Sequence, residues 1–346
     1  MTLQSRGSSA RLGFCCKMMI AEHTPAGIRC VSAGSDITSR TTTLAWLSRQ
    51  TTAVAERRLW DIMQHNITAI ANLIEAVAQL PTTQHMVRIG SETLPMYNHP
   101  QWRYFWAQTD VRVYCDRHFA AVGERARELG VRLSFHPGPF CCIASENPDV
   151  VRHSLEEFEY HTDIARWMGY GTDWHDHGFK INIHMSGRRG AVGFRESLGR
   201  LSPEARNLIT VENDENGHGL EDVLQVSDVC AVVLDVHHHW IRAGEYIRPD
   251  DARVRQVISS WRGVNPVMHF SQSREDVLVD HDPNVLPDMN TLLSQGHCKQ
   301  KLRAHSEFLW NNAANQWARS FFGSFSIQTE AKAKNLASAQ LAAVIN

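Results

Sequence analysis

The sequence predicts an α/β protein, and more specifically a (β/α)8 TIM barrel that forms a single domain. Short aliphatic runs alternate with longer segments of helical periodicity along almost the whole chain. Runs such as residues 208–211 and 231–234 consist of β-branched and aliphatic residues, as expected of parallel strands that are covered on both faces. These two runs end in Glu212 and Asp235, and α/β barrels place their functional groups at the C-terminal ends of the strands.

The N-terminal part of the chain is predicted to form the first strand, a long loop and the first helix. Residues 1–10 are polar and are expected to form a flexible N-terminus before a domain that covers residues 11–346. Residues 11–16 are predicted to form the first strand. Residues 22–52 are rich in Thr, Ser, Gly and Arg and are predicted to form a long loop. Residues 53–80 carry apolar side chains at helical spacing and are followed by a proline, which predicts a helix.

The same alternation continues to the C-terminus. Further strands are predicted at residues 86–89, 131–135, 179–183, 208–211, 231–234, 266–268 and 325–328. Helices are predicted at residues 111–129, 150–168, 194–206, 220–226, 250–261 and 306–321, with an Ala-rich closing helix that ends near residue 343. A long loop is predicted at residues 270–300. Eight strands that alternate with helices favour a closed barrel over an open sheet.

Composition narrows the class of protein. The net charge of −2 argues against a protein that coats nucleic acid non-specifically, although bound divalent cations would shift this balance. No apolar run approaches the roughly 20 residues that span a bilayer, and the N-terminus lacks the apolar core of a signal peptide. We expect a soluble, intracellular monomer with no membrane partner, located in the cytoplasm or nucleoid, or in the host cytoplasm if the protein is viral. The eight cysteines include no C-x-x-C pair and are expected to be reduced.

Histidines and carboxylates gather at the predicted strand ends. The chain has nineteen histidines against six tyrosines, and histidine is the commonest metal ligand. The residues that follow the strands are His99, His136, His184, Glu212, Asp235, His238, His269, His305 and Glu330. One such histidine is more often an ordinary hydrogen-bonding residue, but this collective pattern predicts a metal centre. Because a single zinc ion uses about three protein ligands, the number of residues suits two or three ions that share carboxylates. The side chains of three consecutive residues cannot all point inward. His237 and His239, which flank His238, are therefore interpreted as structural.

A multinuclear centre of this kind suits the hydrolysis of phosphate esters. Bound cations lower the pKa of a water molecule and neutralise the phosphoryl and leaving oxygens. Arg188 and Arg189 follow His184 in a Gly-rich loop, where they would suit contacts with a phosphate backbone or would simply be solvated.

Several motifs, in this order, resemble the UV damage endonuclease family. They are Arg-Leu-Gly-Phe-Cys-Cys at 11–16, Arg-Thr-Thr-Thr-Leu at 40–44, Ser-Phe-His-Pro-Gly at 134–138, Val-Glu-Asn-Asp at 211–214, Asp-Val-His-His at 235–238, His-Ser at 305–306 and Glu-Ala-Lys at 330–332. The resemblance extends over residues 11–335. Members of this family are TIM barrels related to the apurinic endonucleases and xylose isomerases.

The resemblance implies an activity and a site. It implies a hydrolase that nicks damaged double-stranded DNA immediately 5′ of ultraviolet photoproducts, leaves a 3′-hydroxyl, and uses two or three Mn²⁺ ions, with Zn²⁺ and Mg²⁺ as alternatives. Its metal ligands carry over onto the same nine residues, and the carry-over to His99 is the loosest because the loop length varies there. The catalytic residues would be His136, Glu212, Asp235, His269 and Glu330, around a metal-bound hydroxide that attacks the phosphorus in line.

The chain departs from the family at three places. Pro139 and Phe140 replace the Gln-Tyr pair that probes the damaged bases, Phe14 replaces a tyrosine, and Val267 replaces a lysine near the metals. We therefore expect Phe14, Pro139, Phe140, Arg188 and Arg189 to contact DNA or the lesion, with altered lesion preference. Tyr97 is a further aromatic residue that would hold an unstacked base, whereas Trp102 is interpreted as packing under its loop.

Three other functions remain open from the sequence. The first is an endonuclease acting at apurinic sites, and the second is a xylose-isomerase-like sugar isomerase or epimerase with an enclosed pocket. The third is a barrel that binds damaged DNA without cutting it. The surplus of histidines and the long segments 22–52 and 270–304 favour a nuclease with a large, open substrate.

Overall fold

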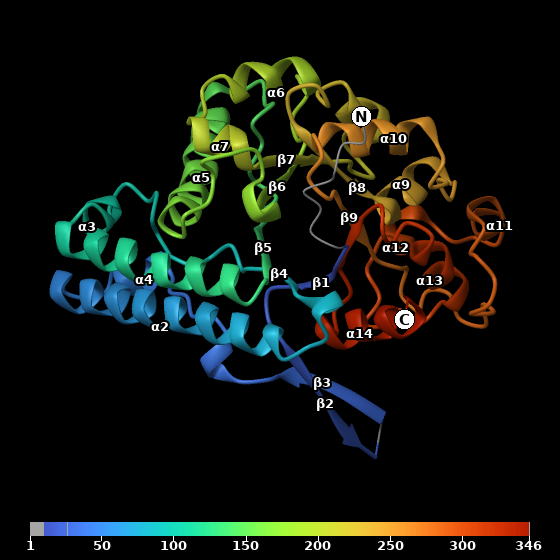
Figure 1. Ribbon diagram of the computed structural model, residues 1–346, viewed down its shortest axis with the longest axis horizontal. Coiled ribbons are helices and arrows are strands. Elements are labelled where there is room, and N and C mark those ends of the chain that lie inside the picture. Colours follow the sequence, from blue (N-terminus) through green and yellow to red (C-terminus); the bar gives the residue numbers. More distant parts are fainter. Residues whose placement is uncertain (1–9, 26, 346) are drawn as a thin grey trace.

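The computed structural model describes residues 10–25 and 27–345. Its centre is a closed barrel of eight parallel strands (Figure 1), as predicted. The strands are β1 (Leu12–Cys15), β4 (Met86–Arg88), β5 (Arg132–Phe135), β6 (Lys180–His184), β7 (Ile209–Glu212), β8 (Ala231–Asp235), β9 (Val267–Phe270) and β10 (Ser326–Thr329). Each strand pairs with its neighbour in this order, and β1 closes the ring by pairing with both β4 and β10. Nearly all of the predicted flexible N-terminus lies outside the described residues.

Helices connect the strands and cover the outside of the barrel (Figure 1). The longer helices are α2 (Thr52–Ala78), α4 (Thr109–Glu128), α5 (Pro148–Trp167), α6 (Gly190–Leu198), α9 (Val236–Ala243), α10 (Ala252–Ser260), α13 (Asn312–Arg319) and α14 (Asn335–Ile345). The shorter helices are α1 (Leu44–Leu47), α3 (Arg103–Trp106), α7 (Pro203–Leu208), α8 (Leu220–Leu224), α11 (Met289–Ser294) and α12 (Lys299–Leu302), with 3₁₀ turns η1 (Ser35–Ile37), η2 (Thr82–Gln84) and η3 (Asp176–Gly178). No helix in the described ranges is both long and apolar enough to cross a membrane.

Side chains on each strand alternate between two cores. The side chains of Leu12 and Phe14 point outward into the large hydrophobic core between the strands and the helices. A smaller apolar cluster of Met86, Ala231, Val233, Trp261 and Val267 fills the lower part of the barrel lumen.

Inward-facing residues form layers across the tilted strands. When the pairings are followed around the barrel, Cys15, His136, Glu212 and His269 fall at one level near the C-terminal strand ends. By the same pairings His184, Asp235 and Glu330 lie one level above them, and Arg88, Asn182, Val233 and Gln328 one level below. The candidate ligands therefore lie at the mouth of the barrel, and beneath them the apolar cluster shares the lumen with buried polar side chains such as Lys180 and Thr210.

The predicted loop at residues 22–52 is wrong in its first part. An antiparallel hairpin of β2 (Met19–Thr24) and β3 (Gly27–Ser32) precedes η1 and α1. Most of the hairpin is exposed, so its sequence lacks the buried apolar face by which the other strands are recognised.

Two helix predictions and one loop prediction also need correction, and one helix was not predicted. The helix predicted at 194–206 is two helices, because Ser202 caps the start of α7 with its side chain and Pro203 follows. The helix predicted at 306–321 begins only at α13, where Asn311 accepts a hydrogen bond from the Ala314 amide. The loop predicted at 270–300 contains α11 and the start of α12. Helix α9, which was not predicted, follows β8 without a break.

Candidate metal centre

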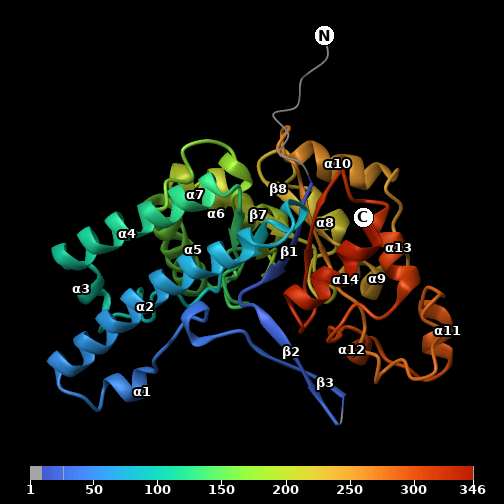
Figure 2. The same ribbon diagram turned by 60° about the horizontal axis from the view of Figure 1, so that its bottom comes forward.

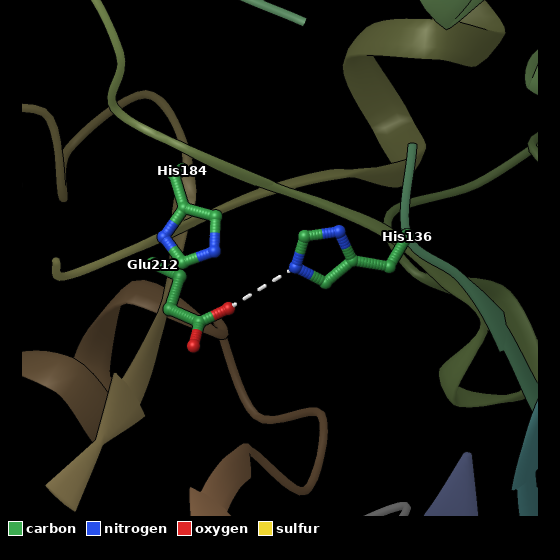
Figure 3. Close-up of side chains that lie close together, drawn as sticks. All are labelled: His136, His184 and Glu212. Atoms are coloured by element: carbon green, nitrogen blue, oxygen red, sulfur yellow. Dashed lines mark ion pairs between the residues drawn. The ribbon is translucent and has the colours of Figure 1, made fainter. Parts of the chain in front are cut away.

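Three groups of His, Asp and Glu side chains lie together at the C-terminal ends of the strands. The groups are His136 with His184 and Glu212, Glu212 with Asp235 and His238, and Asp235 with His269 and Glu330. In each group the potential ligand atoms all lie within 4.8 Å of one another. Figure 3 shows the first group, in which His136 Nε2 lies 3.5 Å from Glu212 Oε2. Because neighbouring groups share Glu212 and Asp235, the three form one continuous cluster.

The strand register explains why these side chains meet. His184 on β6 is paired with Glu212 on β7, and Asp235 on β8 is paired with His269 on β9. Parallel strands end at the same edge of a sheet, so the last inward residues of adjacent strands become neighbours. His136 follows β5 directly and completes the first group.

The turn from β8 into α9 places His238. Asp235 caps α9, and its Oδ1 accepts a hydrogen bond of 2.7 Å from the His238 amide. Asn213 holds the main chain of Asp235 through two hydrogen bonds of 2.9 and 2.8 Å. His238 therefore points back over the barrel mouth, with Nδ1 3.6 Å from Glu212 Oε1 and 3.7 Å from Asp235 Oδ2.

The electrostatic environment differs between the two shared carboxylates. Burial alone would raise the pKa of Glu212, but the imidazoles of His269 and His184 outweigh it and hold that pKa well below its usual value. His269 Nδ1 lies 2.9 Å from Glu212 Oε1. Burial raises the pKa of Asp235 to about 6, because the attraction of His238 is weaker than burial and the repulsion of Glu212 adds to it. Burial lowers the pKa of His136 to about 4.

The donor set fits divalent cations. His184 Nδ1, Asp235 Oδ2 and His269 Nε2 are buried and have no hydrogen-bond partner among the described residues. Buried polar atoms are nearly always satisfied in native proteins, so these three require an explanation. Imidazole nitrogens and carboxylate oxygens together suit Mn²⁺ and Zn²⁺.

Glu330 and His305 lie at the edge of the cluster. Arg88 NH1 lies 2.5 Å from Glu330 Oε1, and His269 Nδ1 lies 3.4 Å from the same oxygen. His305 Nδ1 hydrogen-bonds the main-chain oxygen of Glu330 at 2.8 Å, and its ring centre lies 6.2 Å from that of His238. His305 belongs to none of the three groups of potential ligands.

The structure does not bring His99 into the cluster. This residue lies in the turn before α3, and its Nδ1 accepts a hydrogen bond of 3.3 Å from the Gln101 amide. It also belongs to none of the three groups. A long connection separates it from the end of β4, so its position is not set by the strand that precedes it.

The predicted DNA contacts separate into exposed and buried residues. Phe140 is 89% exposed in the loop after β5, and Pro139 beside it is exposed as well. Arg188 is exposed and lies 3.8 Å from Glu146, and Arg189 pairs with Glu196 at 2.7 Å.

The structure contradicts the prediction that Phe14 contacts DNA or the lesion. Phe14 is only 1% exposed and lies in the main core, where its ring cannot reach a duplex. Trp102 is buried, as interpreted from the sequence. The Tyr97 hydroxyl donates to Asp163 at 2.8 Å, and the ring packs against Tyr160, so Tyr97 is a packing residue too.

His237 and His239, which flank His238, lie apart from the potential ligands. Both are buried outside the three groups, and His239 pairs with Glu245 at 2.9 Å.

Sequence reasoning missed the side chains that support the cluster. Arg88 pairs with Glu330, and Asn182 donates a hydrogen bond to Glu212 Oε2. Asp214 Oδ2 lies 3.5 Å from His184 Nδ1, and Glu215 Oε2 lies 3.5 Å from His238 Nε2. A signal for Asn182 was present, because the period of two in Lys-Ile-Asn-Ile-His puts it on the same side of β6 as His184.

We expect the binding of a divalent cation to release protons at neutral pH. Burial would lower the pKa of His238, but Asp235, Glu212 and Glu215 outweigh it and raise that pKa to about 10. An imidazole must be neutral to act as a ligand, so His238 has to give up its proton on binding. Mn²⁺ affinity should therefore rise with pH between 6 and 9, and the number of protons released should fall as the pH approaches the pKa of His238.

Calorimetric titration with Mn²⁺ in buffers of different ionisation enthalpy measures this release. His136, which is already neutral at pH 7, should contribute no proton. A binding heat that does not depend on the buffer would contradict the prediction.

Comparisons with known proteins cover nearly the whole chain. Residues 10–346 match the model of the family described as UV-endonuclease UvdE. A crystal structure of SacUVDE is similar over 97% of this chain and 98% of that chain, with a TM-score of 0.69 and 19% identity. Endonuclease IV from Thermus thermophilus is similar over 80% of this chain and 92% of that chain, with a TM-score of 0.51 and 16% identity. At these identities, the two structures show the fold alone.

Curated relatives are also similar in sequence. A UV-damage endonuclease of Neurospora crassa is 28% identical over 234 residues, which is 60% of this chain and 35% of that protein. A UV DNA damage endonuclease of Halalkalibacterium halodurans is 30% identical over 162 residues, 44% of this chain and 47% of that protein. A UV DNA damage endonuclease of Bacillus thuringiensis is 22% identical over 316 residues, 86% of this chain and 87% of that protein. The chain thus spans about a third of the first relative and about half of the second.

Proposed function

The chain belongs to the UV-endonuclease UvdE family, and from this we propose that it cuts the backbone of damaged double-stranded DNA with the help of divalent metal ions. The cut would lie immediately 5′ of an ultraviolet photoproduct. The observation that supports this most is the continuous cluster around Glu212 and Asp235, in which buried ligand atoms have no hydrogen-bond partner within the described part of the chain. The cluster lies at the C-terminal strand ends, where barrels of this kind carry out their chemistry.

We propose that two or three ions, with Mn²⁺ as the first choice, are held by residues already described. The core set is His136, His184, Glu212, Asp235, His238, His269 and Glu330, with His305 at its edge and His99 outside it. Bound divalent cations would polarise the phosphoryl oxygens and lower the pKa of a water molecule.

The protein's own residues would orient the cluster and keep it ionised. His136, His269 and Asn182 surround the carboxylate of Glu212 and fix its direction. Burial would raise the pKa of Glu330, but Arg88 together with His269 and His305 lowers it and keeps the side chain in its charged form. Asp235 orients His238 through the cap of α9. Such preorganisation holds charges in place before the substrate arrives.

Phe140 is proposed to stack on a base at the lesion. Its ring is exposed in the loop that begins at His136, four residues along the chain from that ligand. Stacking of a base on an aromatic ring contributes about 1–3 kcal/mol, so Phe140→Ala should reduce kcat/KM on irradiated DNA by roughly 5- to 150-fold. Because the side chain is exposed, the melting temperature should not change.

Phe140→Tyr is the matched control for this prediction, since it keeps the ring. Steady-state nicking of an irradiated duplex measures both variants. Equal loss in both, or no loss in Phe140→Ala, would argue against a stacking role.

Nicking of a supercoiled plasmid tests the proposed function. Irradiated, depurinated and untreated plasmid would be incubated with Mn²⁺ and with a chelator. We expect cutting of irradiated plasmid with Mn²⁺ only. Cutting of depurinated plasmid alone would indicate an apurinic-site endonuclease. If irradiated DNA is bound but not cut in any metal, the protein is a DNA-binding protein. If it binds metal but neither binds nor cuts DNA, sugar isomerisation becomes the function to test.

A further inference from the structure

The β2–β3 hairpin extends away from the barrel in both views (Figures 1 and 2). Five of the six residues of β2 are exposed, as are Gly27, Ile28 and Arg29 of β3. Among the described residues, β2 pairs only with β3. Its base is fastened to the body by Asn335, whose side chain accepts from the Met19 amide at 2.6 Å and donates to the Met19 oxygen at 3.1 Å.

The hairpin exposes apolar side chains on both of its faces. Ile20 is 48% and Ile28 56% exposed. Ile20 pairs with Val31, whereas Ile28 pairs with His23, so the two isoleucines point to opposite faces. A two-stranded hairpin is marginally stable alone, and unpaired strand edges attract partners. A flat protein surface would cover one of the two isoleucines and leave the other exposed.

The hairpin begins beside the metal centre. Only residues 16–18 separate it from β1, whose last residue, Cys15, has its Sγ 4.0 Å from Glu330 Oε1. The Cys16 amide donates to the Arg88 oxygen at 2.6 Å. Any substrate that reaches Glu330 therefore passes close to the base of the hairpin.

A groove of duplex DNA has walls on both sides. The major groove of B-form DNA is about 12 Å wide and admits a two-stranded β-ribbon. Arg29 is exposed and suits a phosphate, but Glu22 lies opposite it in the register, so the hairpin itself would add mainly apolar contacts, such as those to thymine methyl groups.

We propose that the β2–β3 hairpin enters a groove of the substrate duplex next to the cut site, with Ile20 and Ile28 against opposite walls. This inference rests on the proposed function, because that function supplies the DNA partner. The hairpin acts in holding the duplex and takes no part in the reaction at phosphorus.

The test is the double variant Ile20→Ser/Ile28→Ser, read by fluorescence anisotropy with a labelled irradiated duplex in chelator, so that binding is seen without cutting. Burial of two isoleucines predicts a loss in affinity of about tenfold or more. Because no charge is removed, the slope of log affinity against log salt should stay unchanged. With Mn²⁺, KM should rise by a similar factor while kcat changes less than twofold.

Val113→Ser, on the exposed face of α4, is the matched control and should leave the affinity unchanged. The double variant would be uninformative if it failed to fold. A second variant, in which Gly-Gly replaces residues 20–31, should therefore show the same loss of affinity for the irradiated duplex. Affinity equal to that of the original protein would overturn the inference, as would a hairpin-dependent dimer in sedimentation with unchanged DNA affinity. If the original protein itself fails to bind or nick irradiated DNA, the proposed function fails instead.

Discussion

Glu212→Gln should abolish metal-dependent nicking while the protein stays folded. Glu212 is the carboxylate shared by two of the three ligand groups, and it faces the imidazoles of His136 and His269. The amide keeps the shape of the side chain but removes its charge and one oxygen ligand. Metal ions contribute several kcal/mol of transition-state stabilisation, so we expect kcat to fall on the order of 10³-fold or more.

Plasmid nicking, metal content after dialysis and the melting temperature would be measured together. Glu159→Gln is the matched control, because Glu159 is a partly buried carboxylate that hydrogen-bonds Ser202 away from the cluster. We expect the control to keep its activity. If Glu212→Gln retained a tenth of the activity, Glu212 would not be a central metal ligand.

Arg88→Met should cause the largest loss of stability of any single change at the centre. Removing one partner of a largely buried ion pair leaves the other charge uncompensated, which costs about 3–5 kcal/mol. Glu330 is the stranded partner, and in the intact protein Arg88, His269 and His305 together lower its pKa against the effect of burial. The intact protein keeps most of this stabilisation until the pH falls to the folded pKa of Glu330, whereas in Arg88→Met the uncompensated carboxylate takes up a proton already in mild acid, which relieves the penalty. The difference between the two proteins should therefore be greatest near neutral pH and shrink in acid.

Urea unfolding at pH 7 and at pH 4, with chelator and with Mn²⁺, would measure this difference. Bound cations compensate Glu330 in part, so Mn²⁺ should reduce the loss. Arg125→Met is the control, because Arg125 pairs with Glu75 on the exposed helix surface, and it should leave the midpoint nearly unchanged. A loss of the same size at both pH values would mean that Arg88 stabilises the fold by packing instead.

The barrel was predictable because its strands are covered on both faces. A run such as Ile209–Glu212 is β-branched up to its final carboxylate and is buried throughout, which no exposed strand would be. The β2–β3 hairpin has no buried face and so gave no such pattern. Helix α9 was not predicted because no loop separates it from the strand: Asp235 is both the last residue of β8 and the cap of the helix. The segment before α13 contains Phe308 and Leu309, whose apolar side chains imitate a helical face although the chain is not helical there.

The cluster was predictable from the strand ends, and its supporting residues were not. Histidines and carboxylates at the ends of parallel strands must converge, whereas Arg88 and Asn182 look like polar interruptions within short strands until the register is known. The predicted contact of Phe14 with DNA is wrong for the same reason, because it requires the side chain to point into the barrel. The neighbouring Gly13 faces the lumen, where an added Cβ would meet Met86, and this direction follows only from the pairing of β1 with β4.

The barrel closes where β1 pairs with β10, and this pairing decides when the metal centre can form during synthesis of the chain. The side chains of the cluster come from strands spread from β5 to β10, and Glu330 follows the last of these. Its partner Arg88 lies on β4, which is joined to β10 only through β1. While a ribosome is still synthesising the chain, the ring is open and this partnership does not exist. The complete cluster can therefore form only after Glu330 has been translated, although the group of His136, His184 and Glu212 precedes it in the chain.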